Sequence, residues 1–103
     1  MATSDYTWNG TGLKFAVSMT CTGFDMNSDD WTITVTKGKT SIVFDRDTAI
    51  QDAQENWYIC VDSSLLGPGM AQIIFDAHVP DEDFEGGIRH EIQKYDLINI
   101  QRL

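Results

Sequence analysis

Basic residues are scarce in this sequence. Seven lysines and arginines stand against sixteen aspartates and glutamates, which gives a formal net charge of −9 at neutral pH. The seven bases are scattered and form no stripe that could displace counterions from nucleic-acid phosphates. An anionic membrane would repel the chain for the same reason. The charge therefore predicts neither a nucleic-acid partner nor a membrane partner.

Long apolar runs are missing too, because no segment approaches the ~20 apolar residues that a membrane-spanning helix needs. The opening residues MATSDY lack the basic and then apolar segments of a secretory signal. These absences predict a protein that is used inside the cell or leaves it by another route, such as a virus particle. With 103 residues, 42% of them hydrophobic, the chain has enough apolar surface for one domain with a real core.

Cysteine occurs only at Cys21 and Cys60. Neither belongs to a CxxC pair or has a neighbouring histidine, which argues against a zinc site at the cysteines. Either one disulfide between facing strands or two buried free thiols would fit the sequence. We favour two buried free thiols, because each cysteine lies in an apolar segment and no secretory signal is present.

Apolar residues alternate with polar ones in several segments. In LKFAVSM the apolar residues share one face with a period of two, and in WTITVT they alternate with three threonines. This period is typical of a strand with one face on a core and the other in water. Lys37-Gly38-Lys39 predicts a tight hairpin turn in which Gly38 has a positive φ. The residues expected in or beside the core are Phe15, Val17, Trp31, Ile33, Val35, Ile59, Val61, Ile73 and Phe75.

Turn signals separate the remaining apolar segments. Residues 45–56 predict a loop with at most one helical turn. Gly67-Pro68-Gly69 predicts a further turn, with Leu65 and Leu66 tucked beneath it. The remaining strands are expected at 57–61, 70–79, 88–95 and 97–102, the last two joined near Asp96.

About seven strands and almost no helix predict an all-β fold. The expected architecture is a single antiparallel β-sandwich, immunoglobulin-like or similar, over residues 12–103, with residues 1–11 as an N-terminal arm. A small barrel is the alternative. The strand at 70–79 and the terminal strand at 97–102 are expected to be open sheet edges, which either pair with neighbours or are guarded.

The segment HVPDEDFEGGIRHEI holds four acids within five residues. Asp81, Asp83 and Glu85 are spaced like the first, third and fifth ligands of an EF-hand loop. The twelfth position would be Ile92, where calcium requires a bidentate glutamate. The three acids are therefore candidates only for a calcium site of another kind.

A structural role explains the same segment better. Pro80 cannot donate to a sheet and ends the preceding strand, and Asp81 and Asp83 can accept backbone hydrogen bonds in a turn. Phe84 is expected to fold back onto the core. Gly86-Gly87 supplies the dihedral angles needed to enter the next strand. A catalytic carboxylate pair is disfavoured, because acids on a glycine-flanked turn are solvated.

The sequence contains no recognisable catalytic constellation. It has neither a GxSxG elbow nor a glycine-rich phosphate loop, and His78 and His90 are interpreted as strand-surface residues. Trp31 and Trp57 fall in phase with core positions, whereas Trp8 is expected to be exposed, which leaves carbohydrate stacking as an alternative function. We therefore expect no enzyme activity, no catalytic residue and no cofactor.

Several segments together resemble small β-sandwich proteins of phage and prophage tails. They are the strand at 13–19, the hairpin at 31–44, the segment WYICVDSSLLGPGMAQIIFDAHVPD and the following DFEGGIRHEI. The nearest comparison is the N-terminal domain of baseplate upper proteins, which link receptor-binding parts to the tail. The resemblance covers most of residues 12–101, and its motifs are mainly turn and strand-end residues.

The resemblance implies a non-enzymatic structural module of a virion tail or baseplate. Such a module is made in the bacterial cytoplasm and assembles with copies of itself and with neighbouring virion proteins. A homo-oligomer is expected, because a net charge of −9 opposes promiscuous contacts and favours specific, closed ones. The alternative is a small β-sandwich module that binds carbohydrate or calcium.

Overall fold

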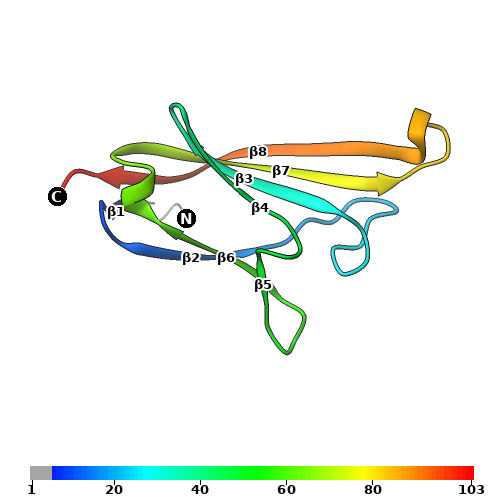
Figure 1. Ribbon diagram of the computed structural model, residues 1–103, viewed down its shortest axis with the longest axis horizontal. Coiled ribbons are helices and arrows are strands. Elements are labelled where there is room, and N and C mark those ends of the chain that lie inside the picture. Colours follow the sequence, from blue (N-terminus) through cyan, green and yellow to red (C-terminus); the bar gives the residue numbers. More distant parts are fainter. Residues whose placement is uncertain (1–5) are drawn as a thin grey trace, which may run out of the picture.

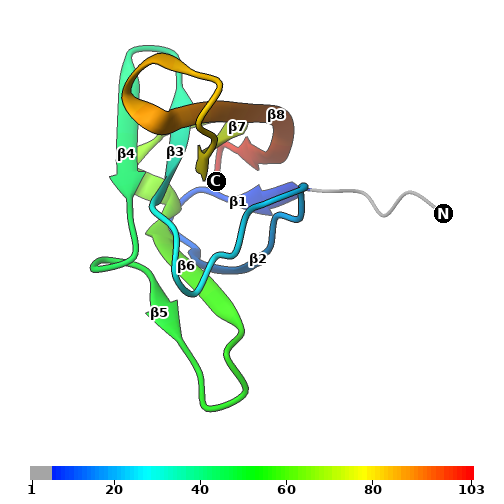
Figure 2. The same ribbon diagram turned by 90° about the vertical axis from the view of Figure 1, so that its right-hand side faces the viewer.

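Two facing β-sheets make up the protein in the computed structural model, which describes residues 6–103 (Figures 1 and 2). The predicted all-β sandwich is confirmed, with eight strands. The larger sheet has the order β1 (Tyr6–Trp8), β8 (Ile88–Gln101), β7 (Gly69–Pro80), β3 (Trp31–Lys37) and β4 (Thr40–Phe44). The smaller sheet has the order β2 (Gly12–Val17), β6 (Trp57–Asp62) and β5 (Ile50–Gln51).

All strand pairs are antiparallel except β1 with β8, which run parallel. Two short 3-10 turns, η1 (Ser63–Leu65) and η2 (Glu85–Gly87), complete the regular structure. Within residues 6–103 no helix has the length and hydrophobicity that crossing a membrane requires. The first five residues of the expected N-terminal arm lie outside the described residues, and Tyr6–Trp8 of that arm forms β1.

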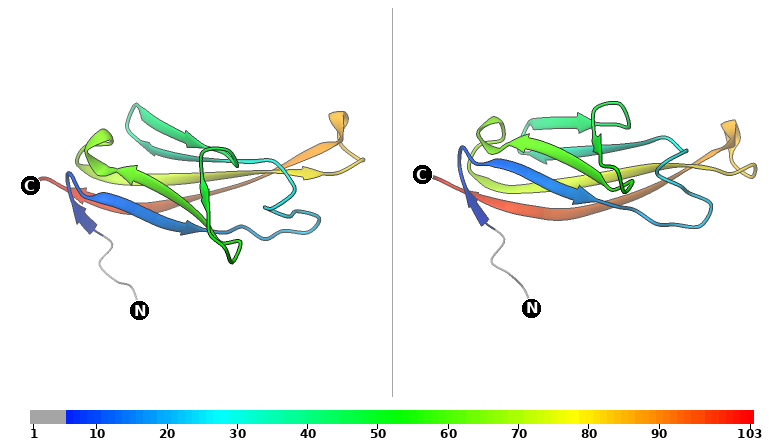
Figure 3. Two further views of the ribbon diagram at one scale, coloured as in Figure 1. Left: turned by 60° about the horizontal axis from the view of Figure 1, so that its bottom comes forward. Right: turned by 90° about the horizontal axis from the view of Figure 1, so that it is seen from below.

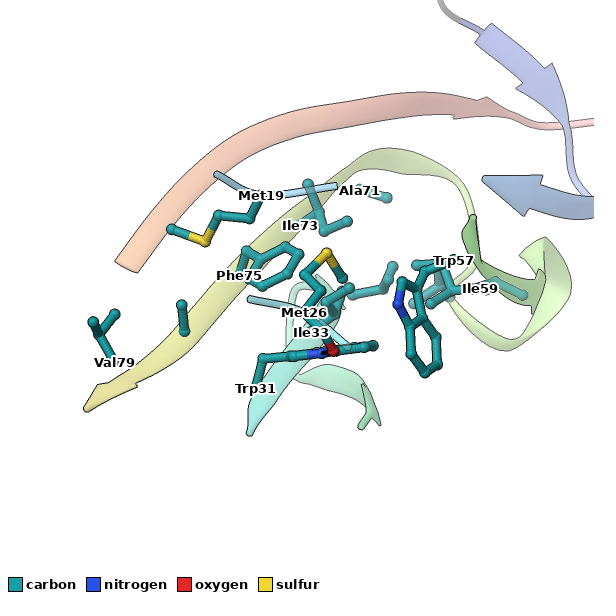
Figure 4. Close-up of a cluster of buried hydrophobic side chains, with 14 of the residues drawn as sticks. Met19, Met26, Trp31, Ile33, Trp57, Ile59, Ala71, Ile73, Phe75 and Val79 are labelled. Atoms are coloured by element: carbon teal, nitrogen blue, oxygen red, sulfur yellow. Dashed lines mark hydrogen bonds between the residues drawn. The ribbon is translucent and has the colours of Figure 1, made fainter. Parts of the chain in front are cut away.

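The core lies between the two sheets and contains the residues that the period of two predicted, together with others such as Met19, Met26 and Ile100 (Figure 4). Trp31 packs edge-on against Trp57, with ring centroids 5.2 Å apart, and lies 5.6 Å from Phe75. Its indole nitrogen donates to the Met26 carbonyl at 3.0 Å, so the polar end of this buried ring is satisfied. Phe15, which was also predicted for the core, is partly buried against this cluster.

The predicted tight turn is confirmed at the hairpin between β3 and β4, where Gly38 has the expected positive φ, of 59°. Of the two leucines expected beneath the turn after β6, Leu66 is buried as predicted, but Leu65 is 64% exposed. Residues 45–56 form the expected loop, in which the Ala49 backbone N–H donates to the Asp45 carbonyl at 2.9 Å, and also the short strand β5, which was not expected.

The two strands expected at 88–95 and 97–102 are one continuous strand, β8. The register shifts where Ala71 pairs with Ile98 but Gln72 pairs with Asp96, so that Leu97 is an extra residue on β8. This β-bulge switches the core-facing positions from odd to even residue numbers, which brings Ile98 and Ile100 onto the core. Asp96 is not a turn residue but accepts a hydrogen bond from the Gln72 amide at 2.9 Å.

The prediction of which strands form the sheet edges is wrong. β7 is not an edge, because β3 and β8 flank it on either side. The end of β8 is not free either, since Asn99 to Gln101 pair with β1. The unpaired part of the larger sheet's edge on this side is residues 88–98 of β8, which lies beside the unpaired edge of β2 (Figure 3).

Candidate functional site

The acidic loop after β7 is held by its own hydrogen bonds. The Asp81 carboxylate accepts from the Asp83 backbone N–H at 3.0 Å and from the Arg89 guanidinium at 3.2 Å. Gly86 and Gly87 have positive φ angles of 80° and 75°, as the return into β8 required. These contacts give the loop the structural role that its sequence indicated.

Phe84 does not plug the core, contrary to expectation. Its side chain is 48% exposed. The hairpin of β7 and β8 extends beyond the smaller sheet, so its tip has no opposing layer on which Phe84 could pack (Figure 1).

The three calcium candidates are not brought together. One Asp81 oxygen is engaged by Arg89, and Asp83 and Glu85 are exposed. Within residues 6–103 the acidic, cysteine and histidine side chains that converge closely enough for three to share an ion are Asp76, His78 and His90.

Both cysteines are free thiols, but the expectation that both are buried is wrong. Cys60 is exposed and Cys21 is half-buried in the loop after β2. Trp57, Ile59 and Val61 occupy the core-facing side of β6, so the alternation places Cys60 on the outer face. Within residues 6–103 the larger sheet lies on the core side of β6, and no further sheet covers the face that carries Cys60.

His78 and His90 lie opposite each other on β7 and β8, on the outer face of the larger sheet. Their ring centroids are 4.7 Å apart. Asp76 is two residues before His78 and therefore on the same face. His90 Nδ1 is 2.8 Å from one oxygen of the Asp76 carboxylate, and His78 Nε2 is 3.8 Å from the other.

The sequence does not predict this cluster, because each histidine taken by itself has the pattern of a strand-surface residue. The signal was present in the hairpin, since Pro80 pairs with Ile88 and each step back along β7 matches a step forward along β8. Two such steps pair His78 with His90. The pairing can be read from the sequence only if the ends of the connecting loop are known, and residue propensities locate the ends of a loop poorly.

A polar depression of about 460 Å³ lies beside His78. Arg46 lines it, donates to the Asn27 carbonyl at 2.9 Å and lies 3.7 Å from the Asp30 carboxylate. Asp45 at its rim accepts backbone hydrogen bonds from Asp47 and Thr48, which hold the pKa of Asp45 below its usual value. Asp30, Asp45 and Arg46 in this lining thus already have partners, although the buried Arg46 Nε itself has none among residues 6–103.

An apolar cleft of about 240 Å³ opens between the edges of β2 and β8. Phe15 and Val17 line it from β2, and Tyr95 and Leu97 line it from β8. Tyr95 is 54% exposed, so the cleft is reachable from outside. The open side of the sandwich therefore combines two unpaired strand edges, of β2 and β8, with this apolar cleft between them.

Comparison with known proteins finds no matching family model, no similar curated protein and no similar solved structure. The function is therefore inferred from the arrangement of the chain's own residues.

Proposed function

We propose that this chain is a non-enzymatic assembly module of a phage or prophage tail or baseplate. It acts by pairing with copies of itself and with neighbouring virion proteins, and it is made in the bacterial cytoplasm. The observation that carries the proposal is the open side of the sandwich, where residues 88–98 of β8 have no partner strand. The resemblance to tail proteins supplies the biological setting.

An unpaired strand edge presents a row of backbone donors and acceptors that a further strand can satisfy. The free part of β8 spans eleven of its fourteen residues, because β1 covers only Asn99 to Gln101. That is longer than a typical whole strand of five or six residues. A partner strand could therefore form a complete ladder along it.

Charge favours a second copy as the partner. The free edge carries the bases Arg89 and Lys94 and the acids Glu91 and Asp96, so its signs are balanced although the chain has a net charge of −9. Two such edges can meet without the repulsion that opposes other contacts between copies. Antiparallel pairing of β8 with β8 uses the same surface on both chains and gives a closed two-fold dimer.

Apolar side chains at this edge add to the backbone pairing. Ile92 is 61% exposed on the outer face, and Tyr95 is 54% exposed at the cleft. Burying both in a dimer removes apolar surface from water, which stabilises association by roughly 25 cal/mol per Å² before the cost of immobilising the chains.

Sedimentation velocity at tens of micromolar tests self-association. We expect a dimer or a larger closed oligomer that Ile92→Asp dissociates. Val43→Asp is the matched control, because Val43 is 59% exposed on β4, the opposite edge of the same sheet. A monomeric wild-type chain, or equal effects of both substitutions, would contradict pairing through β8. Tail components encoded by the neighbouring genes would support the virion setting.

A carbohydrate-binding module is the second candidate, favoured by one exposed aromatic pair. Tyr6 and Trp8 on β1 are 46% and 47% exposed, with ring centroids 6.1 Å apart. Thermal melting with a glycan panel tests it, since a ligand stabilises the fold by about 2.7 kcal/mol at 100 times its dissociation constant. A rise in melting temperature that is lost in Trp8→Ala would favour this function. Calcium binding has less support, because Arg89 occupies the Asp81 carboxylate.

A further inference from the structure

Two imidazoles and one carboxylate converge on the outer face of the larger sheet, and one of them, His90, belongs to the free part of β8 on which assembly is proposed. One ligand atom from each of Asp76, His78 and His90 can be chosen so that all lie within 4.8 Å of one another. We propose that these three side chains form a binding site for a divalent transition-metal ion of the zinc class, with water at the fourth position. All three ligands come from one chain, so the site does not require the proposed assembly, although His90 lies on the same strand edge.

The spacing of the donor atoms fits such an ion. Zinc–nitrogen and zinc–oxygen bonds of about 2.0–2.2 Å in a tetrahedron place neighbouring donor atoms about 3.3 Å apart. His90 Nδ1 and Asp76 Oδ1 are 2.8 Å apart, and His78 Nε2 and Asp76 Oδ2 are 3.8 Å apart. The two distances run to different oxygens of Asp76 and lie on either side of the required value, so side-chain rotations must draw the three donor atoms, now within 4.8 Å of one another, closer together.

The sheet fixes two of the three ligands. Asp76 and His78 lie on β7, a central strand, and their side chains are 26% and 30% exposed. The His78 backbone N–H donates to the Asp30 carbonyl at 2.9 Å, which ties this strand position to the neighbouring loop. His90 is 54% exposed and can adjust its ring while leaving room for water. Sites on strands keep their geometry better than sites on loops.

The donor types select the class of ion. Imidazole nitrogen suits zinc, copper and nickel, whereas calcium takes six to eight oxygen ligands and magnesium prefers oxygen in an octahedron. A single carboxylate between two histidines offers too few oxygens for either hard cation. The nearby cation Arg46 is matched by Asp30 at 3.7 Å, and the net charge of −9 also favours a bound cation.

Isothermal titration of the full, tag-free chain with zinc chloride tests the site. The chain carries Cys21→Ser and Cys60→Ser, because thiolates are zinc ligands as well. We expect one saturable ion per chain, with calcium and magnesium failing to compete. His90→Gln and Asp76→Asn should each weaken zinc binding by about 10-fold or more. The control is Asp83→Asn with Glu85→Gln, which removes two charges from the acidic loop and should leave the affinity unchanged.

Imidazole resonances in NMR spectra locate the ion. Zinc should shift the signals of both histidines, and circular dichroism of each variant confirms that the fold is retained. His90 is exposed, so its replacement tests the ligand without disturbing the core. The inference is wrong if no one-to-one binding is measured, if His90→Gln and Asp76→Asn bind zinc as the parent does, or if the control variant loses the affinity instead.

Discussion

Ser63 offers a sharp test of how the N-terminal segment is held. Its side chain is fully buried at the start of η1. The hydroxyl accepts from the Gly10 backbone N–H at 2.9 Å and donates to the Trp8 carbonyl at 3.4 Å, while the Ser63 backbone N–H donates to Thr11 at 3.1 Å. This one residue therefore links the segment after β1 to the end of β6.

Ser63→Ala removes both side-chain bonds and leaves almost no cavity. A hydrogen bond contributes about 0.5–1.5 kcal/mol, and the Gly10 N–H is left without its protein acceptor, so we expect a loss of about 1–2 kcal/mol. For a chain of this size each kcal/mol lowers the melting temperature by roughly 4–8 °C. Urea denaturation followed by tryptophan fluorescence measures the free energy, and thermal melting gives the second readout.

Ser64→Ala is the control for this substitution. Ser64 donates to the Asp62 carboxylate at 2.7 Å, but the pair is exposed and water can replace it, so the change should stay within about 0.5 kcal/mol. Amide exchange at Asn9, which donates to the Gln101 carbonyl at 2.8 Å, reports whether β1 loosens locally. Equal stabilities for the two variants, with unchanged exchange at Asn9, would refute the assigned role of Ser63.

Three further substitutions test other parts of the fold. The hydrogen bond from Tyr58 to Asp52 raises the pKa of Tyr58 above its usual value, so Asp52→Asn should return the Tyr58 pKa toward normal in an NMR titration. Backbone hydrogen bonds, the largest effect coming from Asn56, lower the pKa of Asp52. The ionised carboxylate therefore stabilises the fold at neutral pH, and this stabilisation is lost as the pH falls through the pKa of Asp52. Asp52→Asn should reduce the acid sensitivity of urea unfolding. Gly69 has a φ of 128°, and Gly69→Ala should cost more than about 1 kcal/mol in the same assay. Ile59 is fully buried, and Ile59→Ala should cost about 2–5 kcal/mol.

The period of two determined the fold class and most of the core, because it depends only on neighbours along the chain. Trp31, Ile33 and Val35 alternate with threonines, and that pattern is meaningful only for a strand with one buried face. Gly38 likewise marked its turn, since positive φ is a local requirement. The same alternation, carried through β6, places Cys60 on the outer face, whereas the apolar composition of its segment predicted a buried thiol.

Tertiary structure alone decided which strands are neighbours and which edges stay open. A strand's pattern shows which face is buried but not what pairs with its backbone, so β7 looked like an edge although it is central. The bulge at Leu97 has the same origin, because an extra residue is defined only against the partner strand.

The cluster of Asp76, His78 and His90 depends on both the sequence and the tertiary structure. The sequence supplies the donor atoms and puts Asp76 and His78 two residues apart on one face. Only the register of β7 against β8 brings His90 beside them, and that register is set by the length and dihedral angles of the acidic loop. The physical reason is that a shift of one residue in pairing would turn His90 to the opposite face of the sheet.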